Sequence, residues 1–287
     1  MGAKELNIGY FGEEGSFSHA IALKRFGAEA AYHDCASAEI ALTELIGREI
    51  DLAVLPIENA SSGTIADTID QLIRLREGKA GDDFVVRECL AMPIKLVLLS
   101  FGKKPKVITS HPAALAHARS WLTAEYPKAR IEPSPSTSAA AQRALSDADV
   151  AALASGHAAE LYGLPVLRRD VQETIPNRTK FYVVAPRRLA LPGAVAPTHT
   201  SLLFEAAHRP GSLVDALKVL SERGLNLTMI QSRPIPGRFD EYRFFIEFDG
   251  VPEKGGGDSK GLEALEALRA QTHRLSVLGS YPILDLP

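Results

Sequence analysis

The stretch Asp51-Leu52-Ala53-Val54-Leu55-Pro56 predicts a strand buried on both faces, because its apolar residues follow one another without polar alternation. Beyond it, Ile65, Ile69, Leu72 and Ile73 recur at helical spacing and predict a helix with one apolar face. A wholly apolar strand followed by an amphipathic helix is typical of a parallel or mixed sheet covered by helices. The stretch therefore predicts an α/β fold.

The sequence on both sides of this stretch repeats the pattern. Leu6, Ile8 and Tyr10 alternate as a strand, and Ser16 or Ser18 after the glycine-rich loop 12–15 can cap a helix. Further segments read as alternating strands and helices: strands at 94–99, 107–109, 150–154 and 181–185, and helices at 112–122 and 137–145. Helix N-termini that follow strands offer free N–H groups to anions, so we expect a small acidic substrate.

Composition bounds the class of protein. The chain has 287 residues, which is enough for two domains, and 32 Lys and Arg against 35 Asp and Glu give a net charge of -3. This balance predicts neither a nucleic-acid nor a membrane partner. Two cysteines, Cys35 and Cys89, are typical of a reducing compartment, and no apolar run approaches ~20 residues. We expect a cytoplasmic protein.

A second domain is predicted beyond a proline-rich linker. Residues 185–198 contain Pro186, Pro192 and Pro197 and have no sustained period. The predicted elements that follow are a strand (200–206), a helix (213–220), two strands (225–232 and 242–248), a helix (262–268) and a strand (275–278). The order β-α-β-β-α-β predicts an α+β, ferredoxin-like domain.

Six ordered motifs resemble one enzyme family. They are Gly12-Glu13-Glu14-Gly15-Ser16-Phe17-Ser18, Leu55-Pro56-Ile57-Glu58-Asn59, Ser110-His111-Pro112, Ser136-Thr137-Ser138, Tyr162-Gly163-Leu164 and Asn177-Arg178-Thr179-Lys180-Phe181. In this order they are similar to the landmarks of prephenate dehydratase. The segments Arg209-Pro210-Gly211-Ser212-Leu213-Val214 and 226–234 resemble the ACT-type regulatory domain attached to those enzymes.

The resemblance implies a fold and a domain division. The catalytic domain, residues 1–185, would be a two-lobed α/β domain like type II bacterial solute-binding proteins, with its active site between the lobes. The first lobe would comprise about 1–88 with 165–185, and the second 89–164. A linker at 186–198 would lead to the ACT domain at 199–287.

The resemblance also implies a reaction that needs no metal, nicotinamide or other cofactor. Prephenate would lose carbon dioxide and water to give phenylpyruvate in phenylalanine biosynthesis. Thr179 corresponds to the family's functional threonine, and Asn59 would offer an amide to the leaving oxygen or to a carboxylate. Lys180, where relatives usually have arginine, keeps the charge but loses the bidentate fork. These three residues are the predicted catalytic set.

A second set of residues is predicted to bind substrate: Ser16, Ser110, Thr137, Phe181 and His117. The three hydroxyl residues lie near predicted helix starts, where each could cap its helix alone or also contact a carboxylate. His117 follows the Ser-His-Pro motif where relatives differ, and its simplest interpretation is a partly exposed helix histidine. Helical spacing alone does not decide between these alternatives.

The ACT resemblance implies regulation by L-phenylalanine. The predicted contacts are Gly211, Ser212, Leu213, Asn226, Leu227 and Ser232, and related domains bind an amino acid between paired copies, so we expect a homodimer or homotetramer. A structural dimerisation module without ligand is the alternative. Gln231 stands where a glutamate is common.

Four other functions fit the sequence to different degrees. An arogenate dehydratase, whose substrate carries an amino group in place of the keto oxygen, fits the same motifs. A non-catalytic two-lobed binder of amino or aromatic acids fits as well if Lys180 marks lost chemistry. A dinucleotide oxidoreductase is disfavoured because Gly9, Gly12 and Gly15 have the spacing G-x-x-G-x-x-G. A metal hydrolase is disfavoured because the eight histidines are scattered.

Overall fold

A computed structural model describes residues 5–171, 177–252 and 259–287. The chain divides into two compact units. The first comprises residues up to 65, 90–181 and 285–287, and the second comprises 66–89 and 182–284. Three sheets are described, two of them α/β and one of the ferredoxin-like type, so the predicted fold class is confirmed.

The first sheet contains the stretch that predicted the fold. Its strand order is β16-β5-β11-β3-β1-β2, with β4 paired to β3. β1 lies between β2 and β3 and is parallel to both, and helices α1 (Phe17–Phe26) and α2 (Ala38–Gly47) connect these strands. The strands are β1 (Asn7–Phe11), β2 (Ala31–Cys35), β3 (Leu52–Asn59), β4 (Gly63–Thr64), β5 (Phe84–Pro93), β11 (Arg178–Pro186) and β16 (Ile283–Asp285).

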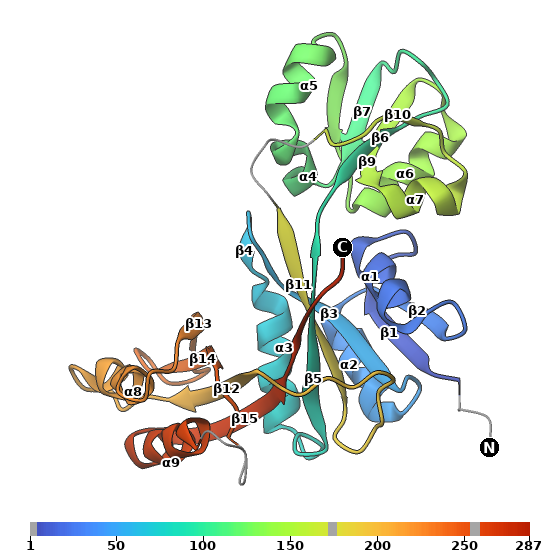
Figure 1. Cartoon of the computed structure of the whole chain (residues 1–287). Helices are drawn as coiled ribbons and strands as arrows, with labels where there is room; N and C mark the ends of the chain where they lie inside the picture. Colours follow the sequence, from blue (N-terminus) through green and yellow to red (C-terminus); the bar gives the residue numbers. More distant parts are fainter. Residues whose placement is uncertain (1–4, 172–176, 253–258) are drawn as a thin grey trace. The chain divides into compact units, whose positions relative to one another are not determined.

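The second sheet belongs to the first unit and is covered on both faces. Its order is β10-β6-β9-β7-β8. Helices α4 (Pro112–His117) and α5 (Arg119–Glu125) cover one face, and α6 (Thr137–Ser146) and α7 (Gly156–Tyr162) cover the other (Figure 1). The strands are β6 (Leu96–Leu99), β7 (Val107–Ser110), β8 (Arg130–Pro133), β9 (Val150–Ser155) and β10 (Val166–Arg168).

Serine residues fix the beginnings of four helices in the first unit. Ser16, Ser37, Ser136 and Ser155 precede α1, α2, α6 and α7, and each Oγ accepts the N–H three residues further on. Each bond satisfies a donor that has no partner inside the helix. All four caps end a strand or follow one within a few residues, and so lie at strand ends.

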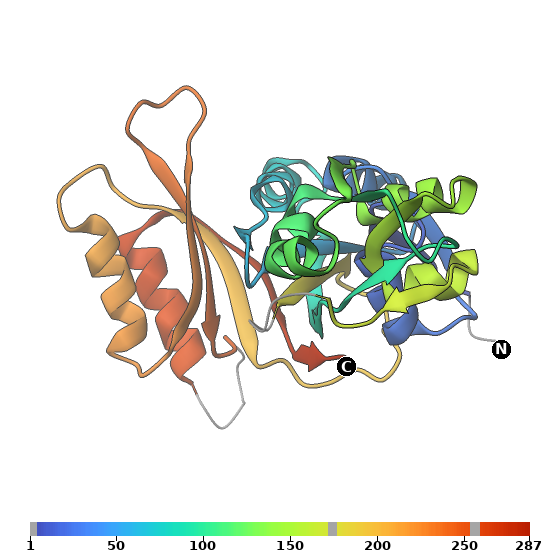
Figure 2. The ribbon, with the colours of Figure 1, turned by 90° about the horizontal axis from the view of Figure 1, so that it is seen from above.

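The second unit contains the predicted β-α-β-β-α-β segment. Its antiparallel sheet has the order β13-β14-β12-β15, and α8 (Ser212–Ser221) and α9 (Lys260–Gln271) cover one face (Figure 2). The strands are β12 (His199–Glu205), β13 (Leu227–Pro234), β14 (Tyr242–Asp249) and β15 (His273–Tyr281). Helix α3 (Ala66–Glu77) belongs to this unit and contacts β15.

Two segments differ from the predicted domain division. β10 pairs with β6 in the second sheet, so the chain leaves that sheet after Arg168, later than the expected boundary near 165. β16 pairs with β5 of the first sheet, although it follows the ferredoxin-like segment. Neither strand is long enough to show a period in the sequence. The division at 185–199 itself stays a prediction.

One glycine allows two strands of the second unit to lie unusually close. A Cβ atom on Gly279 of β15 would lie 2.2 Å from the carbonyl oxygen of Val86 in β5. No real side-chain carbon approaches an oxygen so closely, and the obstructing atom is backbone. Only glycine therefore fits where β15 passes β5.

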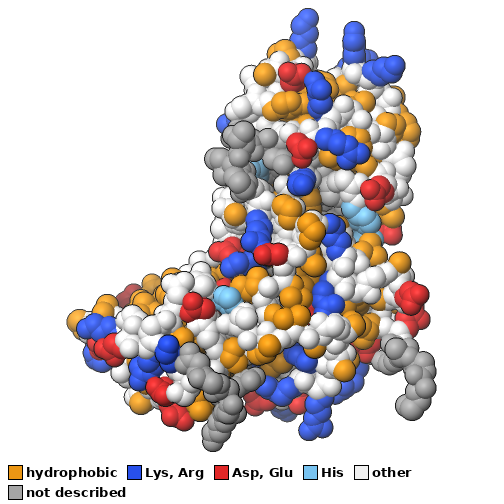
Figure 3. Space-filling model, in the orientation of Figure 1, with side chains coloured by type: hydrophobic (Ala, Val, Ile, Leu, Met, Phe, Trp, Pro, Cys, Tyr) orange, Lys and Arg blue, Asp and Glu red, His pale blue; other side chains and the backbone are white. Residues whose placement is uncertain are grey.

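On the face shown in Figure 3, Lys and Arg side chains are interspersed with Asp and Glu and with apolar residues. Among the residues that the structure describes, no helix is long and apolar enough to cross a bilayer. Within the same ranges, no group of three His, Cys, Asp or Glu residues is placed to hold a metal ion.

Candidate functional site

A cavity of about 700 Å³ lies within the first unit. Its walls come from the loop between β1 and α1, the end of β3, helix α4, the N-terminus of α6 and the beginning of β11. Six of the predicted catalytic and substrate-binding residues line it: Ser16, Asn59, His117, Thr137, Thr179 and Phe181. Distant motifs are thus brought to one cavity at the ends of strands, where α/β folds place ligands.

Asn59 and Thr179 form the hydrogen bond at the centre of the site. The Asn59 Nδ2 donates to Thr179 Oγ1 at 2.8 Å, across 120 residues of sequence. The Asn59 Oδ1 accepts the backbone N–H groups of Ser61 and Ser62, both at 3.0 Å. Because these backbone donors require an oxygen, the amide has one orientation, with its nitrogen toward Thr179.

Lys180, predicted to be catalytic, is not among the described residues that line the cavity. Asn177, Thr179 and Phe181 all line it, whereas the Lys180 Nζ forms an ion pair with Glu58 Oε2 at 3.1 Å. Successive side chains of a strand point to opposite faces, so Lys180 in β11 and Thr179 next to it face opposite ways. The same alternation separates Glu58 from Asn59 in β3.

The N-termini of α1 and α6 meet the cavity, as does that of the short helix α4. Ser16 begins α1, and Ser136 and Thr137 begin α6, and all three residues line the cavity. Ser110 was predicted to join them but is fully buried, and its Oγ donates to the Leu153 carbonyl at 2.6 Å. It ends a strand that is buried throughout, so its hydroxyl satisfies a neighbouring strand in place of a ligand.

The cavity residues that the sequence reasoning missed include His111, Asn177 and Glu13. Asn177 is buried and its Nδ2 lies 3.2 Å from His117 Nε2. It is two residues before Thr179, so strand alternation was a signal that could have found it. His111 stands at the N-cap of α4, inside a motif that was quoted only as a landmark.

The side-chain charges of the cavity are acidic. Glu13 and Asp34 line it, and none of its described lining residues is Lys or Arg. The Glu13 Oε2 accepts a 2.7 Å hydrogen bond from Ser136 Oγ, which also caps α6. Among the described lining residues, the groups that favour an anion are the N-termini of α1, α4 and α6, because none of these side chains carries a fixed positive charge.

The loop Gly12–Gly15 is held by residues of β9 and α7. Tyr162 Oη donates to the Glu14 carbonyl and Ser155 Oγ donates to the Gly15 carbonyl, both at 2.8 Å. His19 Nδ1 accepts the Gly15 N–H at 3.2 Å and also lies 3.2 Å from His157 Nε2. Nδ1 is thus an acceptor, so His19 is neutral, and burial and the neighbouring His157 lower the pKa of His19 to about 4.

This histidine makes stability depend on pH. The pKa of His19 is about 4 in the folded chain and 6.5 ordinarily, so between these values only the unfolded chain binds the proton. We expect the contribution of neutral His19 to the free energy of unfolding to be complete above pH 6.5. It should fall as the pH decreases to 4, by up to about 3 kcal/mol. Urea unfolding at pH 7.5, 5.5 and 4.5 measures it.

The matched control is His19→Asn, whose Oδ1 can accept the Gly15 N–H without titrating. Other acidic groups titrate over the same range, so the readout is the difference between the two stability curves. Parallel curves for the two proteins would contradict the assignment to His19.

The predicted regulatory residues lie at two ends of the ferredoxin-like sheet. Gly211, with φ 83°, is the N-cap of α8, and Ser212 and Leu213 begin the helix. Asn226 exchanges hydrogen bonds with Asp249, which pairs with His199 at the start of β12. Ser232 pairs with Phe244, near the opposite end. One chain therefore does not gather these residues at one point.

A second hollow, of about 400 Å³, adjoins the N-terminus of α8. Its lining includes Arg209, Ser212, Tyr242 and Phe244. Ser212 is the one predicted regulatory residue among its described lining residues, and Gly211, Leu213, Asn226, Leu227 and Ser232 lie outside it. The hollow combines aromatic rings with a guanidinium group, which suits a small molecule with both apolar and carboxylate parts.

Comparison with known proteins finds relatives that are similar over nearly the whole chain. A bifunctional chorismate mutase/prephenate dehydratase of Aquifex aeolicus is 34% identical over 282 residues, covering 97% of this chain and 74% of that protein. The prephenate dehydratase of Arthrobacter aurescens, solved in complex with L-Phe, superposes with a TM-score of 0.83 at 29% identity, over 96% of this chain and 90% of that one.

A further solved structure, GqqA, described as a novel type of quorum quenching acylase, also superposes with a TM-score of 0.83, at 25% identity over 96% of this chain and 98% of that one. The family models match in two places: the prephenate dehydratase model at residues 8–188 and the ACT domain model at residues 200–270. The chain belongs to the prephenate dehydratase family and carries an ACT domain.

Proposed function

We propose that the cavity converts prephenate into phenylpyruvate, carbon dioxide and water, with Thr179 as the donor to the leaving oxygen. The observation that carries the proposal is the fixed Asn59–Thr179 hydrogen bond. Because Asn59 donates to Thr179 Oγ1, the threonine's own proton is free to be donated elsewhere. No acceptor for that proton is found within the described part of the chain.

The reaction breaks two bonds of the substrate ring and forms an aromatic ring. As the ring carbon–oxygen bond breaks, the bond to the ring carboxylate breaks as well, and its electron pair completes the aromatic ring. The departing oxygen leaves as hydroxide, which takes up a proton to become water. A hydrogen bond from Thr179 strengthens as negative charge grows on that oxygen, so it stabilises the transition state more than the substrate.

The substrate's two carboxylates need partners. We propose the N-terminal N–H groups and hydroxyls of α1 and α6, through Ser16 and Thr137, with His117 and Asn177 adding polar contacts. Phe181 would pack against the ring. Glu13 already occupies Ser136 at the α6 N-terminus, so a carboxylate bound there has to share or displace it.

The ACT domain is proposed to bind L-phenylalanine and lower the activity. The relative from Arthrobacter aurescens was solved with L-Phe, and Ser212 of this chain lines a hollow with aromatic and guanidinium groups. Because the predicted contacts lie at two ends of one sheet, a site that uses all of them needs a second copy of the chain. We therefore propose a homodimer or a homotetramer, in the cytoplasm, without nucleic-acid or membrane partners.

Arogenate is the alternative substrate. Glu13 and Asp34 in the lining suit its ammonium group, so the aminated acid has a specific observation in its favour. Acylase activity has less support. The Thr179 hydroxyl accepts from an amide, and among the residues that the structure describes none accepts its proton in a hydrogen bond.

The test is to incubate the purified full chain separately with prephenate and with arogenate and to separate the products. Phenylpyruvate from prephenate, faster than phenylalanine from arogenate, is the expected result. The reverse order would identify an arogenate dehydratase. If neither acid reacts, the chain is a binder and the proposal is wrong.

A further inference from the structure

Helix α3 continues directly from the cavity. Ile65 and Ser62 line the cavity, and α3 begins at Ala66. Between Asn59 and Ala66 lie only residues 60–65, which form a tight hairpin: Asn59 pairs with Gly63, and the Ile65 N–H donates to the Ile57 carbonyl at 2.9 Å. Ala66 follows Ile65 directly in the chain, so α3 is joined to the hairpin without an intervening linker.

The hairpin sets the catalytic amide. The N–H groups of Ser61 and Ser62 fix the orientation of the Asn59 side chain, and Asn59 in turn donates to Thr179. A shift of these two donors changes where Asn59 and the Thr179 hydroxyl point. Misplacement of a reacting group by about 1 Å can cost on the order of a hundredfold in rate.

At its other side, α3 is held by the ferredoxin-like sheet. Asp70 receives two hydrogen bonds from Arg233 of β13, one of them from Nε at 2.6 Å. Arg76 donates to the Val277 carbonyl of β15. Glu77 accepts from Arg243 of β14 at 2.5 Å. One helix therefore has a polar contact with three of the four strands.

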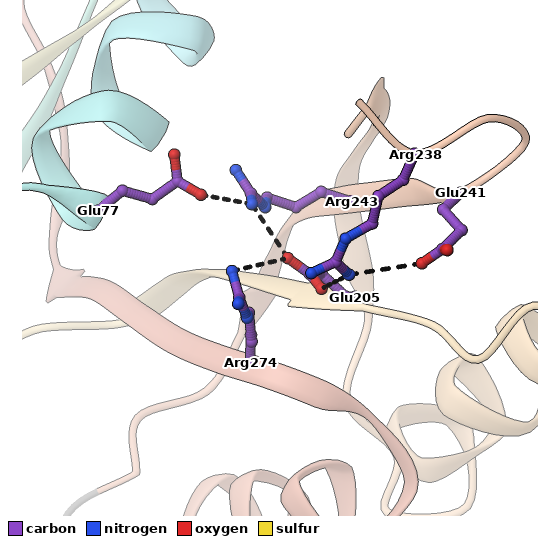
Figure 4. A network of polar contacts seen from close by, with 6 residues as sticks. All are labelled: Glu77, Glu205, Arg238, Glu241, Arg243 and Arg274. Carbon is purple, nitrogen blue, oxygen red and sulfur yellow. Dashed lines mark hydrogen bonds and ion pairs between the residues drawn. The ribbon is translucent and has the colours of Figure 1, made fainter. Parts of the chain in front are cut away.

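The contact at Glu77 belongs to a network whose two central residues are buried (Figure 4). The Arg243 Nη2 also donates to Glu205 Oε1 at 3.0 Å, and Arg238 donates to Glu205 Oε2 at 3.2 Å. Both Glu205 and Arg243 are buried. The Glu77 side chain is 52% exposed, but its partner Arg243 is 9% exposed and held by Glu205, so a movement of Arg243 displaces the partner of Glu77.

We infer that α3 is the element through which the ACT domain controls the catalytic threonine. Ligand binding that alters β13 or β14 would move Asp70 and Glu77, and α3 would shift the Ser61 and Ser62 donors. The inference rests on the proposed function, because it names the route by which phenylalanine would act. It requires the ligand to favour one of two positions of α3.

The test uses the full-length double variant Asp70→Asn/Glu77→Gln. Each substitution keeps the size of the side chain and removes the charge that binds arginine. We expect the ratio of kcat without and with saturating phenylalanine to be at least about fivefold in the wild type, the lower end of usual coupling. In the double variant it should fall below about twofold, with the uninhibited kcat within about threefold of wild type.

Calorimetric titration with phenylalanine distinguishes a broken relay from a lost ligand site. The variant should still bind phenylalanine, and its affinity should no longer respond to substrate, because coupling is reciprocal. The charge-swapped variant Asp70→Arg/Arg233→Asp should recover part of the inhibition. The control is Arg143→Gln, which breaks the 2.7 Å pair with Glu132 in the first unit and should leave inhibition unchanged.

The experiments distinguish failure of the α3 route from failure of the proposed function. Wild-type inhibition that persists fully in the double variant would overturn the α3 route and leave the proposed function intact. A variant that no longer binds phenylalanine would also overturn it, because the pairs would then build the ligand site. A wild type that turns over prephenate without responding to phenylalanine removes the regulatory part of the proposed function, and the route with it.

Discussion

Thr179→Val should lower kcat for prephenate by about 10²–10³-fold, the usual cost of removing one donor to a developing negative charge. Valine has nearly the same shape and lacks the hydroxyl, so the cavity keeps its form. KM should change little, because the lost hydrogen bond forms mainly in the transition state. Steady-state kinetics measures both constants, and circular dichroism shows that the variant is folded.

Two variants serve as controls for Thr179→Val. Thr179→Ser keeps the hydroxyl and should retain most of the activity. Lys180→Met changes the adjacent residue, whose side chain pairs with Glu58 outside the cavity, and should leave kcat within about threefold, because partly exposed ion pairs contribute little. Wild-type turnover in Thr179→Val would remove the threonine from the mechanism, and a collapse in Lys180→Met would return the lysine to it.

Glu205→Ala should destabilise the second unit by about 3–5 kcal/mol, the usual cost of removing one partner from a buried ion pair. The Glu205 side chain is only 5% exposed and faces Arg238, Arg243 and Arg274. Without it, the Arg243 guanidinium, 9% exposed, keeps Glu77 as its one carboxylate partner among the described residues. Urea unfolding followed by circular dichroism is the measurement, because the single tryptophan, Trp121, lies in the first unit.

Glu241→Ala is the matched control for this loss. Glu241 binds the same Arg238 at 3.4 Å, but its side chain is 39% exposed. Exposed pairs contribute about 0–1 kcal/mol, so this variant should unfold close to the wild type. Equal stability losses in the two variants would show that burial of Glu205 does not dominate the network.

The periodic pattern of apolar residues was sufficient to predict the fold class, because each element buries a periodic apolar face. The buried β3 and the six elements from β12 to β15 fall where period 3.6 or period 2 placed them. β10 and β16, at three residues each, carry no period, so their sheets are set by tertiary pairing. The domain boundaries depend on those short strands and stay a prediction.

The candidate site was predictable where a motif and a geometric rule agreed. Asn59 and Thr179 were predicted together, and the structure places them in hydrogen-bond contact. Lys180 was grouped with Thr179 by its motif alone, although the alternation of strand side chains turns the two residues to opposite faces, and its catalytic role stays a prediction. The Arg243–Glu205 network lay beyond prediction, because periodicity identifies a buried face without naming its partner.

The close passage of β15 over β5 bears on protein engineering. With the Val86 carbonyl 2.2 Å from where a Cβ would stand, position 279 has no room for even the smallest side chain. A saturation library at this position should return glycine alone among stably folded clones. The distance between the two backbones therefore decides which substitutions this crossing tolerates. Stabilising substitutions in β15 should be sought at other positions of the strand.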